Sequence, residues 1–173
     1  MNNENLITLT ETSSQIETSA IYSNCKTYRY ALTKYWNKNG KRLLFILLNP
    51  STATEKQNDA TVERCERRSR LMNYGAFRVC NLFAFRTKEP KIMKKQKDPI
   101  GRHNDQIINQ SIKWADDILC AWGSHGKYLG RSFELENFLK SQTYEIFHLG
   151  LTKDRLPKHP LYIAYKKKFE RWY

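Results

Sequence analysis

The run Leu43-Leu44-Phe45-Ile46-Leu47-Leu48 is the feature that most limits what this chain can fold into. Strands that are covered on one face alternate between apolar and polar residues, whereas strands covered on both faces are apolar throughout. The run therefore predicts a central strand in a sheet that has helices on both faces. It ends abruptly at Asn49-Pro50-Ser51.

The segments around this run alternate between strand and helix patterns. We expect strands over 28–36, 43–48, 77–82, 117–122 and 144–149, and helices over 60–73, 101–114 and 128–140. Asn39-Gly40 predicts a tight turn, so the first strand would form a hairpin with the second. The expected fold class is α/β: a three-layer α/β/α arrangement with a short, mostly parallel four-stranded central sheet plus an N-terminal antiparallel hairpin strand.

The domain organisation follows from length and local composition. Residues 1–20 are rich in Ser, Thr, Asn and Glu, which is typical of a flexible N-terminal segment. Residues 21–173 are long enough to bury one core, so we expect a single α/β domain. The longest irregular stretch, 83–99, is expected to be functional or mobile.

The charge indicates the kind of partner. A net charge of +13 and a pI near 9.7 favour a polyanion, and DNA is the first candidate. No apolar run is long enough to span a bilayer and no hydrophobic stretch opens the chain, so we expect no membrane partner and a monomer in the cytoplasm.

Metal and cofactor chemistry has no sequence signal. The four cysteines, Cys25, Cys65, Cys80 and Cys120, include no CxxC pair, and three of them lie in apolar patterns. We expect buried free thiols, as in a reducing compartment, and no metal. No Walker loop or GxGxxG fingerprint is present, so we expect no cofactor.

Polar residues follow each of the expected strands. In open α/β sheets, ligands bind beyond the carboxyl ends of the strands. The residues expected at this edge are Asn49, Pro50, Ser51, Asn81, Phe83, Trp122, Gly123, His125, Lys153 and His159. Each also has a structural alternative, such as ending a strand or packing in the core. Asp59 follows the first strand, and either Asp59 or Asn58 is expected to cap the helix over 60–73.

Several motifs occur in an order that is familiar. The stretches LLNPSTA, DATVERC, VCNLFAFRTKEP, DPIGRHND, AWGSHG and LGLTKDRLPKHPLY resemble an uncharacterised bacterial and phage family, domain of unknown function 1643. The same layout distantly resembles the uracil-DNA glycosylase superfamily. Leu47-Leu48-Asn49-Pro50-Ser51 is similar to its first motif, Asn81 to its base-reading Asn, and His159-Pro160-Leu161 to its later His-Pro-Ser loop.

This second resemblance implies a DNA-binding, glycosylase-like protein that hydrolyses the N-glycosidic bond of a modified or mismatched base. Asn49 would orient the water, with Asp59 as the ionisable alternative, and His159 would donate to the departing base. Asn81 would pair with the base edge, and Phe83 or Trp122 would stack on it. Two alternatives stay open: an inactive module that binds nucleic acid or a modified base, and an enzyme that acts on free nucleosides or nucleotides.

Basic residues would hold the DNA strand. They form one group on the helix over 60–73 and a second group in the segment that follows Asn81. The expected nucleic-acid contacts are Arg64, Arg67, Arg68, Arg86, Lys88, Lys94, Lys95, Lys97 and Arg102.

Overall fold

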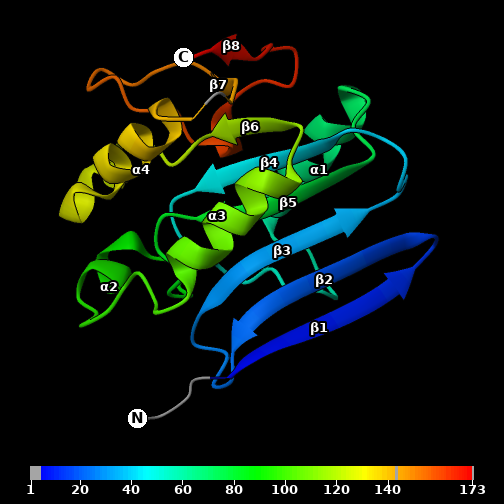
Figure 1. The fold of residues 1–173 in the computed structure, drawn as a ribbon, viewed down its shortest axis with the longest axis horizontal. Helices are drawn as coiled ribbons and strands as arrows, with labels where there is room; N and C mark the ends of the chain where they lie inside the picture. The colour runs from blue at the N-terminus through cyan, green and yellow to red at the C-terminus, as the bar shows by residue number, and fades with distance from the viewer. Residues whose placement is uncertain (1–4, 143, 173) are drawn as a thin grey trace.

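A computed structural model describes residues 5–142 and 144–172, which form an α/β fold around one mixed sheet. The eight strands in this part of the chain lie in the order β1-β2-β3-β5-β4-β6-β7-β8 (Figure 1). They are β1 (Leu6–Ser13), β2 (Ile16–Ser23), β3 (Arg29–Tyr35), β4 (Arg42–Leu47), β5 (Ala76–Asn81), β6 (Asp117–Cys120), β7 (Ile146–His148) and β8 (Glu170–Arg171). The expected α/β class is confirmed.

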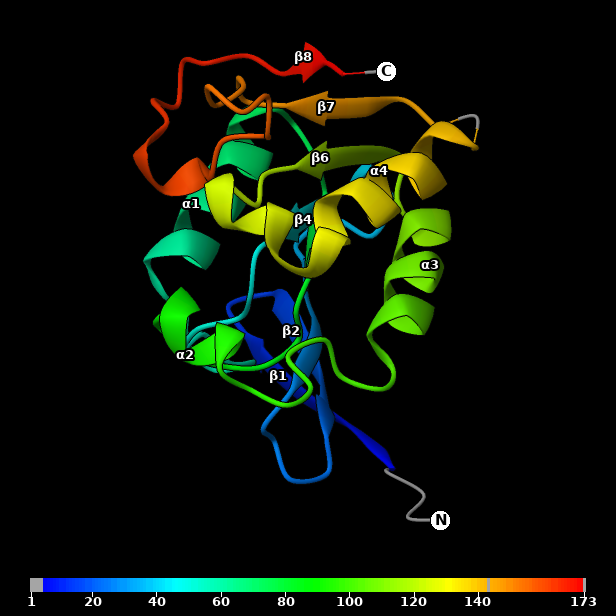
Figure 2. The ribbon, with the colours of Figure 1, turned by 90° about the vertical axis from the view of Figure 1, so that its left-hand side faces the viewer.

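Helices connect these strands. The α-helices are α1 (Ala60–Leu71), α2 (Pro90–Lys94), α3 (Asn104–Trp114) and α4 (Arg131–Lys140), and the 3-10 helices are η1 (Ser124–Gly130) and η2 (Pro160–Tyr162). Figure 2 shows α1 on one side of the sheet and α3 on the other. Among residues 5–142 and 144–172, every helix is too short or too polar to cross a lipid bilayer.

Strand β4 lies at the centre of the sheet. It pairs in parallel with β5 on one side and β6 on the other, and β7 pairs in parallel with β6. Leu44 and Ile46 belong to the core cluster beneath α3 and α4, whereas Leu43, Phe45 and Leu47 belong to the cluster beneath α1. The prediction that this apolar run is a strand buried on both faces is therefore confirmed.

The helices bury one stripe each. Val62 and Cys65 of α1 face the first side of the sheet, and Ile108 and Ile112 of α3 face the second. Cys65, Cys80 and Cys120 are buried free thiols, as expected, and Cys25 is exposed.

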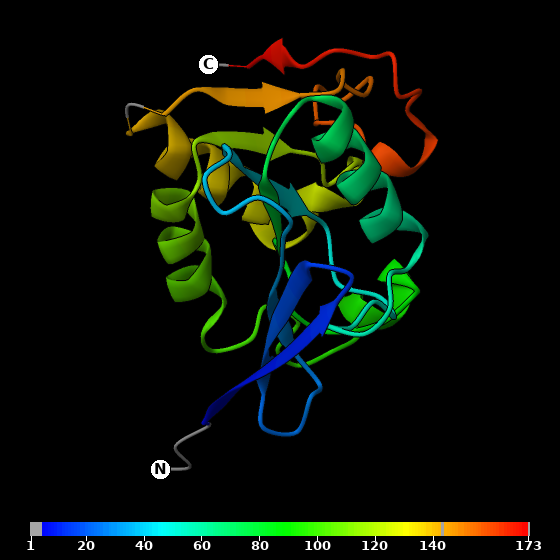
Figure 3. The ribbon, with the colours of Figure 1, turned by 90° about the vertical axis from the view of Figure 1, so that its right-hand side faces the viewer.

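The N-terminal segment differs from the prediction of a flexible arm over 1–20. Residues 6–13 and 16–23 form the antiparallel hairpin β1–β2, and β2 pairs with β3. Figure 3 shows this hairpin extending the sheet beyond the helices. Because β1 is almost entirely exposed, its Thr and Glu residues need no apolar partner, and its strand pattern is weak. Residues 1–4 lie outside the described residues.

The neighbour of β3 also differs from the prediction. The expected hairpin between 28–36 and 43–48 does not form, because β5 lies between β3 and β4. The connection after β3 crosses the start of β5, where the Gly75 carbonyl accepts from the backbone N–H groups of Trp36 and Asn37. A Cβ on Gly40 would lie 2.7 Å from Cα of Gly75, so this crossing requires glycine.

Candidate functional site

A cleft with a volume of about 600 Å³ opens beyond the carboxyl ends of β4 and β6. This is the edge at which ligands bind in open α/β sheets. The expected site residues that line it are Asn49, Ser51, Asp59, Lys88, Trp122, Gly123, His125 and His159. The structure thus gathers residues that lie as much as 110 positions apart in the chain (159 minus 49).

A smaller cavity of about 30 Å³ adjoins the cleft and shares part of its wall. Asn49, Asp59 and His159 line both hollows, and the smaller one adds Asn81 and Arg29. Strand β5 carries Asn81 at its last position and β3 carries Arg29 at its first. A volume of this size holds a water molecule or a small polar group.

Asn49 is partly held by its own loop. Its Nδ2 donates to the carbonyl of Thr87 at 2.8 Å and to that of Pro50 at 3.2 Å. The Thr87 backbone N–H in turn donates to the carbonyl of Pro50 at 2.9 Å. These bonds join the loop after β4 to the segment after β5, and they leave the amide oxygen of Asn49 as the atom that it can offer to a ligand.

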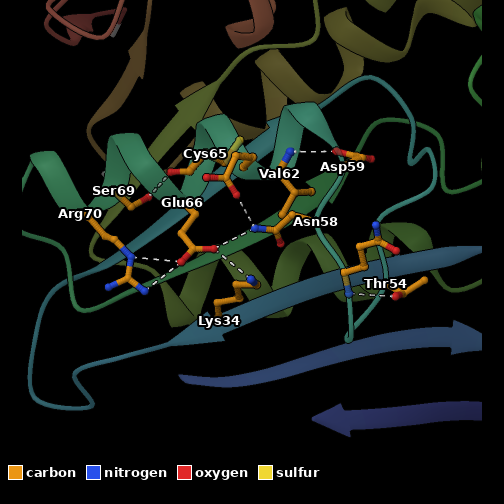
Figure 4. A network of polar contacts seen from close by, with 11 residues as sticks. Lys34, Thr54, Asn58, Asp59, Val62, Cys65, Glu66, Ser69 and Arg70 are labelled. Carbon is orange, nitrogen blue, oxygen red and sulfur yellow. Dashed lines mark hydrogen bonds and ion pairs between the residues drawn. The ribbon is translucent and has the colours of Figure 1, made fainter. Parts of the chain in front are cut away.

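Asp59 caps helix α1. Its Oδ1 accepts from the backbone N–H groups of Thr61 and Val62, and its Oδ2 accepts from that of Ala53 at 3.2 Å. Figure 4 shows Asp59 beside Val62 at the start of the helix. The structural role expected for Asp59 is therefore present, while the same carboxylate lines the cleft.

Helix α1 is fixed to the sheet by Glu66. The Glu66 carboxylate accepts from Lys34 Nζ at 2.9 Å, from Arg70 Nη2 at 2.9 Å and from Asn58 Nδ2 at 3.0 Å (Figure 4). Because Lys34 belongs to β3, this network ties the helix to the strand that carries Arg29. It thereby holds the Asp59 end of the helix at the cleft.

His159 presents a neutral ring. Its Nδ1 accepts from the backbone N–H of Leu161 at 3.4 Å, so the proton of the neutral ring lies on Nε2. Burial lowers the pKa of His159, and the negative charge of Asp59 opposes this only in part. Gly123 has φ +73°, and a Cβ there would lie 3.5 Å from His159 Cβ, so glycine suits this wall of the cleft.

His125 lies at the rim of the same cleft. Lys94 Nζ lies 3.3 Å from His125 Nδ1 and 5.3 Å from the centre of the Tyr128 ring. Burial lowers the pKa of His125, and the positive charge of Lys94 lowers it further. The rim is therefore cationic through Lys94 while the imidazole stays neutral near pH 7.

Two residues that line the smaller cavity each carry a buried polar atom without a hydrogen-bond partner in the described part of the chain: Asn81 Oδ1 and Arg29 Nε. Arg29 is 2% exposed, and its Nη1 donates to the carbonyl of Ala53 at 2.6 Å. Burial lowers the pKa of Arg29 to about 10, while Asp59 acts in the opposite direction. Buried polar atoms without partners are costly, so these two atoms indicate a place for a polar ligand group.

The sequence did not single out Arg29. Arginine is mostly exposed in proteins, and this one stands at the start of a strand with no motif around it. The usable signal is its position in the aromatic segment Tyr28-Arg29-Tyr30, where a strand buried on both faces leaves no solvent for the side chain.

Some expected ligand contacts are not brought to the cleft. Phe83 is 0% exposed and packs against Tyr128 at a ring distance of 5.7 Å, so stacking on a base is wrong for this residue. Pro50 is buried and Lys153 is exposed, and neither lines the cleft. Trp122 belongs to the cleft wall, but its indole is 1% exposed and packs against Trp172, so it offers no open face.

The expected basic contacts divide into exposed and occupied groups. Arg68 is 2% exposed and donates to the carbonyls of Ile163, Ala164, Tyr165 and Lys167, so its expected contact with DNA is wrong. Arg64 donates to the carbonyls of Pro160 and Ile163, although its side chain is only half-buried. Arg67, Lys88, Lys95, Lys97 and Arg102 are exposed.

The fold and cleft define a class: an α/β protein with a polar, ligand-sized cleft beyond the carboxyl ends of its parallel strands. In the described part of the chain, no cluster of three His, Cys, Asp or Glu residues is placed to hold a metal. The chain belongs to the family described as "Protein of unknown function (DUF1643)", whose model matches residues 29–161. No significantly similar curated protein or solved structure was found.

Proposed function

We propose that this protein binds DNA and receives a single base in the cleft, where its side chains promote hydrolysis of the N-glycosidic bond. The observation that carries the proposal is the buried amide oxygen of Asn81, which has no donor in the described residues and shares a cavity with Asn49 and His159. The smaller cavity admits only a small polar group, so a base held in the adjoining cleft would meet that oxygen through one exocyclic N–H or through a bridging water. A base in a duplex must leave the stack to reach the cleft.

The reaction needs water at the anomeric carbon and a donor for the leaving base. In the proposed step, the water oxygen bonds to C1′ while the C1′–N bond breaks and its electron pair passes to the base. The amide oxygen of Asn49 orients the water, and the Nε2–H of His159 donates to the base, where negative charge develops. The proton lost by the water passes to solvent or to Asp59, the carboxylate in the same wall.

A binding module without catalysis is the second candidate. It is favoured by the bonds of the two residues that would activate water, since Asn49 holds the Thr87 loop and Asp59 caps α1. Both residues then have structural functions in the absence of any reaction.

The experiment incubates the full chain with oligonucleotides that each contain one modified or mismatched base, and with the matching free nucleosides and nucleotides. Released base and abasic sites are measured by mass spectrometry. Release from an oligonucleotide is the expected result. Tight binding of DNA without release of base from any substrate would show that the chain is a binding module. Release from free nucleosides or nucleotides alone would show that it is an enzyme that acts on those small molecules.

Asn49→Ala separates the first two candidates. Water positioning contributes to the transition state rather than to ground-state binding, so this variant is expected to lose base release and keep nearly full DNA affinity. Loss of the donor to the Thr87 carbonyl is expected to cost about 1 kcal/mol of stability. Activity is therefore compared at a temperature where circular dichroism shows both proteins folded. Full activity in the variant would leave Asn49 with its loop function only.

A further inference from the structure

A second open hollow, with a volume of about 420 Å³, lies beside the cleft. Three segments surround it: the turn between β2 and β3, the loop after β4 and the segment after β5. Its lining residues are Lys26, Thr27, Ser51, Thr52, Arg86, Thr87 and Lys88. Three of these carry positive charge and four carry a hydroxyl group. Ser51, Thr52, Thr87 and Lys88 line the cleft as well, so the two hollows are neighbours.

The three segments are joined by backbone bonds. The Arg86 N–H donates to the Thr27 carbonyl at 3.0 Å, and Arg86 Nη1 donates to the Lys26 carbonyl at 3.1 Å. On the other side, the Thr87 N–H donates to the Pro50 carbonyl at 2.9 Å. The backbone of the hollow is therefore built by chain segments that hold one another, and the exposed Lys26 and Lys88 project from these segments.

Arg86 is placed for a ligand that accepts hydrogen bonds. Its guanidinium lies 5.2 Å from the centre of the Tyr22 ring, which orients the planar group. Its Nε is buried and donates to no acceptor within the described residues. Glu55, a nearby carboxylate, accepts instead from the Tyr22 hydroxyl at 3.0 Å. No carboxylate is among the described residues that line the hollow.

We propose that this hollow is an anion subsite that binds a phosphate ester, with Arg86, Lys26 and Lys88 as its cations. Arginine pairs with phosphate through parallel N–H donors, and lysine acts as a point charge beside it. This proposal deepens the proposed function, because the phosphate would belong to the nucleotide whose base enters the adjoining cleft. The phosphate comes either from a DNA strand or from a free nucleotide, and the chemistry of the subsite is the same for both.

The test uses two double variants with equal loss of charge. Lys26→Gln with Lys88→Gln removes two cations of the subsite without touching the bonds of Arg86. Lys38→Gln with Lys113→Gln removes two exposed lysines near the opposite end of β4: one in the β3–β4 connection and one in the last turn of α3. Arg86→Gln is a third variant, and circular dichroism establishes whether it remains folded.

Three probes are titrated against each full-length protein by calorimetry or fluorescence anisotropy: thymidine, thymidine 5′-monophosphate and a labelled single-stranded oligonucleotide. Wild type is expected to bind at least one phosphate-bearing probe more tightly than thymidine. Lys26→Gln/Lys88→Gln is expected to weaken that binding about tenfold beyond the Lys38→Gln/Lys113→Gln control, since charge-assisted bonds are lost. If thymidine 5′-monophosphate binds more tightly than thymidine, the phosphate belongs to a free nucleotide. If only the oligonucleotide binds more tightly than thymidine, the phosphate belongs to a DNA strand.

The failures of the two proposals are distinct. Equal weakening in both double variants would overturn the subsite, whatever the outcome of the base-release assay. Absence of base release together with a phosphate preference that depends on Lys26 and Lys88 would overturn hydrolysis and support the subsite.

Discussion

At the scale of single residues, Asp59 has two relations to the fold: its carboxylate accepts hydrogen bonds from the backbone of helix α1, and the residue lines the candidate cleft. The two roles respond differently to substitution. Asparagine caps helices about as well as aspartate, whereas alanine does not cap them. A comparison of the two variants therefore separates the structural contribution from the chemical one.

We expect Asp59→Ala to lower the free energy of unfolding by about 1–2 kcal/mol and Asp59→Asn to lower it by less. If the carboxylate takes the proton from water, both variants lose base release, because an amide does not ionise usefully. Urea unfolding and the base-release assay measure the two effects. Full release by the Asn variant would leave Asp59 with its capping role alone.

His159 gives a prediction about pH. Burial holds its folded-state pKa below the ordinary value of about 6.5, so between these two values the unfolded chain binds more protons than the folded one. The stability due to neutral His159 is complete above about pH 6.5 and is lost as the pH falls through the folded pKa. The pKa values of His125 and His148 are lowered in the same direction.

The free energy of unfolding is therefore expected to fall between pH 7 and pH 5.5, and His159→Gln is expected to reduce this fall. The comparison needs urea unfolding of both proteins at the two pH values. An identical pH dependence in the variant would show that His159 does not contribute to it.

At the scale of elements, the sequence predicted correctly the helix and the strand whose apolar residues follow a clear pattern. The helix expected over 60–73 is observed at Ala60–Leu71, and the central strand was located within one residue. The hairpin β1–β2 was missed because its first strand, β1, buries little and carries a weak pattern, although β2 buries Ala20 and Tyr22. The place of β5 between β3 and β4 depends on a crossing at Gly40 and Gly75, which no local pattern encodes.

The candidate site could also be predicted in part: the sequence located its residues at one edge of the sheet but did not indicate where each side chain lies. Asn49, Asn81 and His159 share a cavity because the ends of parallel strands meet at one edge, and this follows from the order of elements. Side-chain direction does not follow from that order. Phe83 and Arg68 turn inward and Arg29 lines the smaller cavity, because burial and hydrogen bonding across the fold determine where each side chain lies.

Helix α1 and the C-terminal segment form one unit through Arg68. This buried guanidinium donates to four carbonyls between residues 163 and 167. Arg68→Ala leaves those carbonyls without their charged donor, and we expect a loss of more than about 2 kcal/mol in the free energy of unfolding. Arg67→Ala on the same helix is the control. Its exposed side chain contacts the Tyr165 ring, so a loss below about 1 kcal/mol is expected.

Limited proteolysis adds a local readout to this comparison. The Arg68→Ala protein is expected to be cut faster within residues 163–172 than the Arg67→Ala protein. Equal stability and equal cleavage in the two variants would contradict the proposed link between helix and segment.

At the scale of the whole molecule, the net charge of +13 includes cations that are buried as well as cations that are exposed and could contact DNA. Arg68 and Arg29 are buried and bonded to carbonyls, so they add no charge to the exposed surface that a DNA strand would contact. The exposed cations that followed from the sequence lie on two parts of the chain: Arg67 on α1, and Lys88, Lys95, Lys97 and Arg102 in the segment between β5 and α3. The second group belongs to a chain segment that forms part of the cleft wall, and Lys88 of this group lines the cleft.

This distribution predicts how DNA affinity depends on salt. Each phosphate contact releases condensed counterions, so contact with about five phosphates gives a log–log slope of roughly −4 to −5 on duplex DNA. Fluorescence anisotropy of a labelled duplex between low and moderate salt measures the slope. Lys95→Glu with Lys97→Glu is expected to weaken binding and make the slope shallower, whereas Lys38→Glu with Lys113→Glu, at the opposite end of the sheet, is expected to have a smaller effect. An affinity that does not change with salt, or equal effects of the two charge reversals, would mean that the basic segment before α3 does not hold the strand.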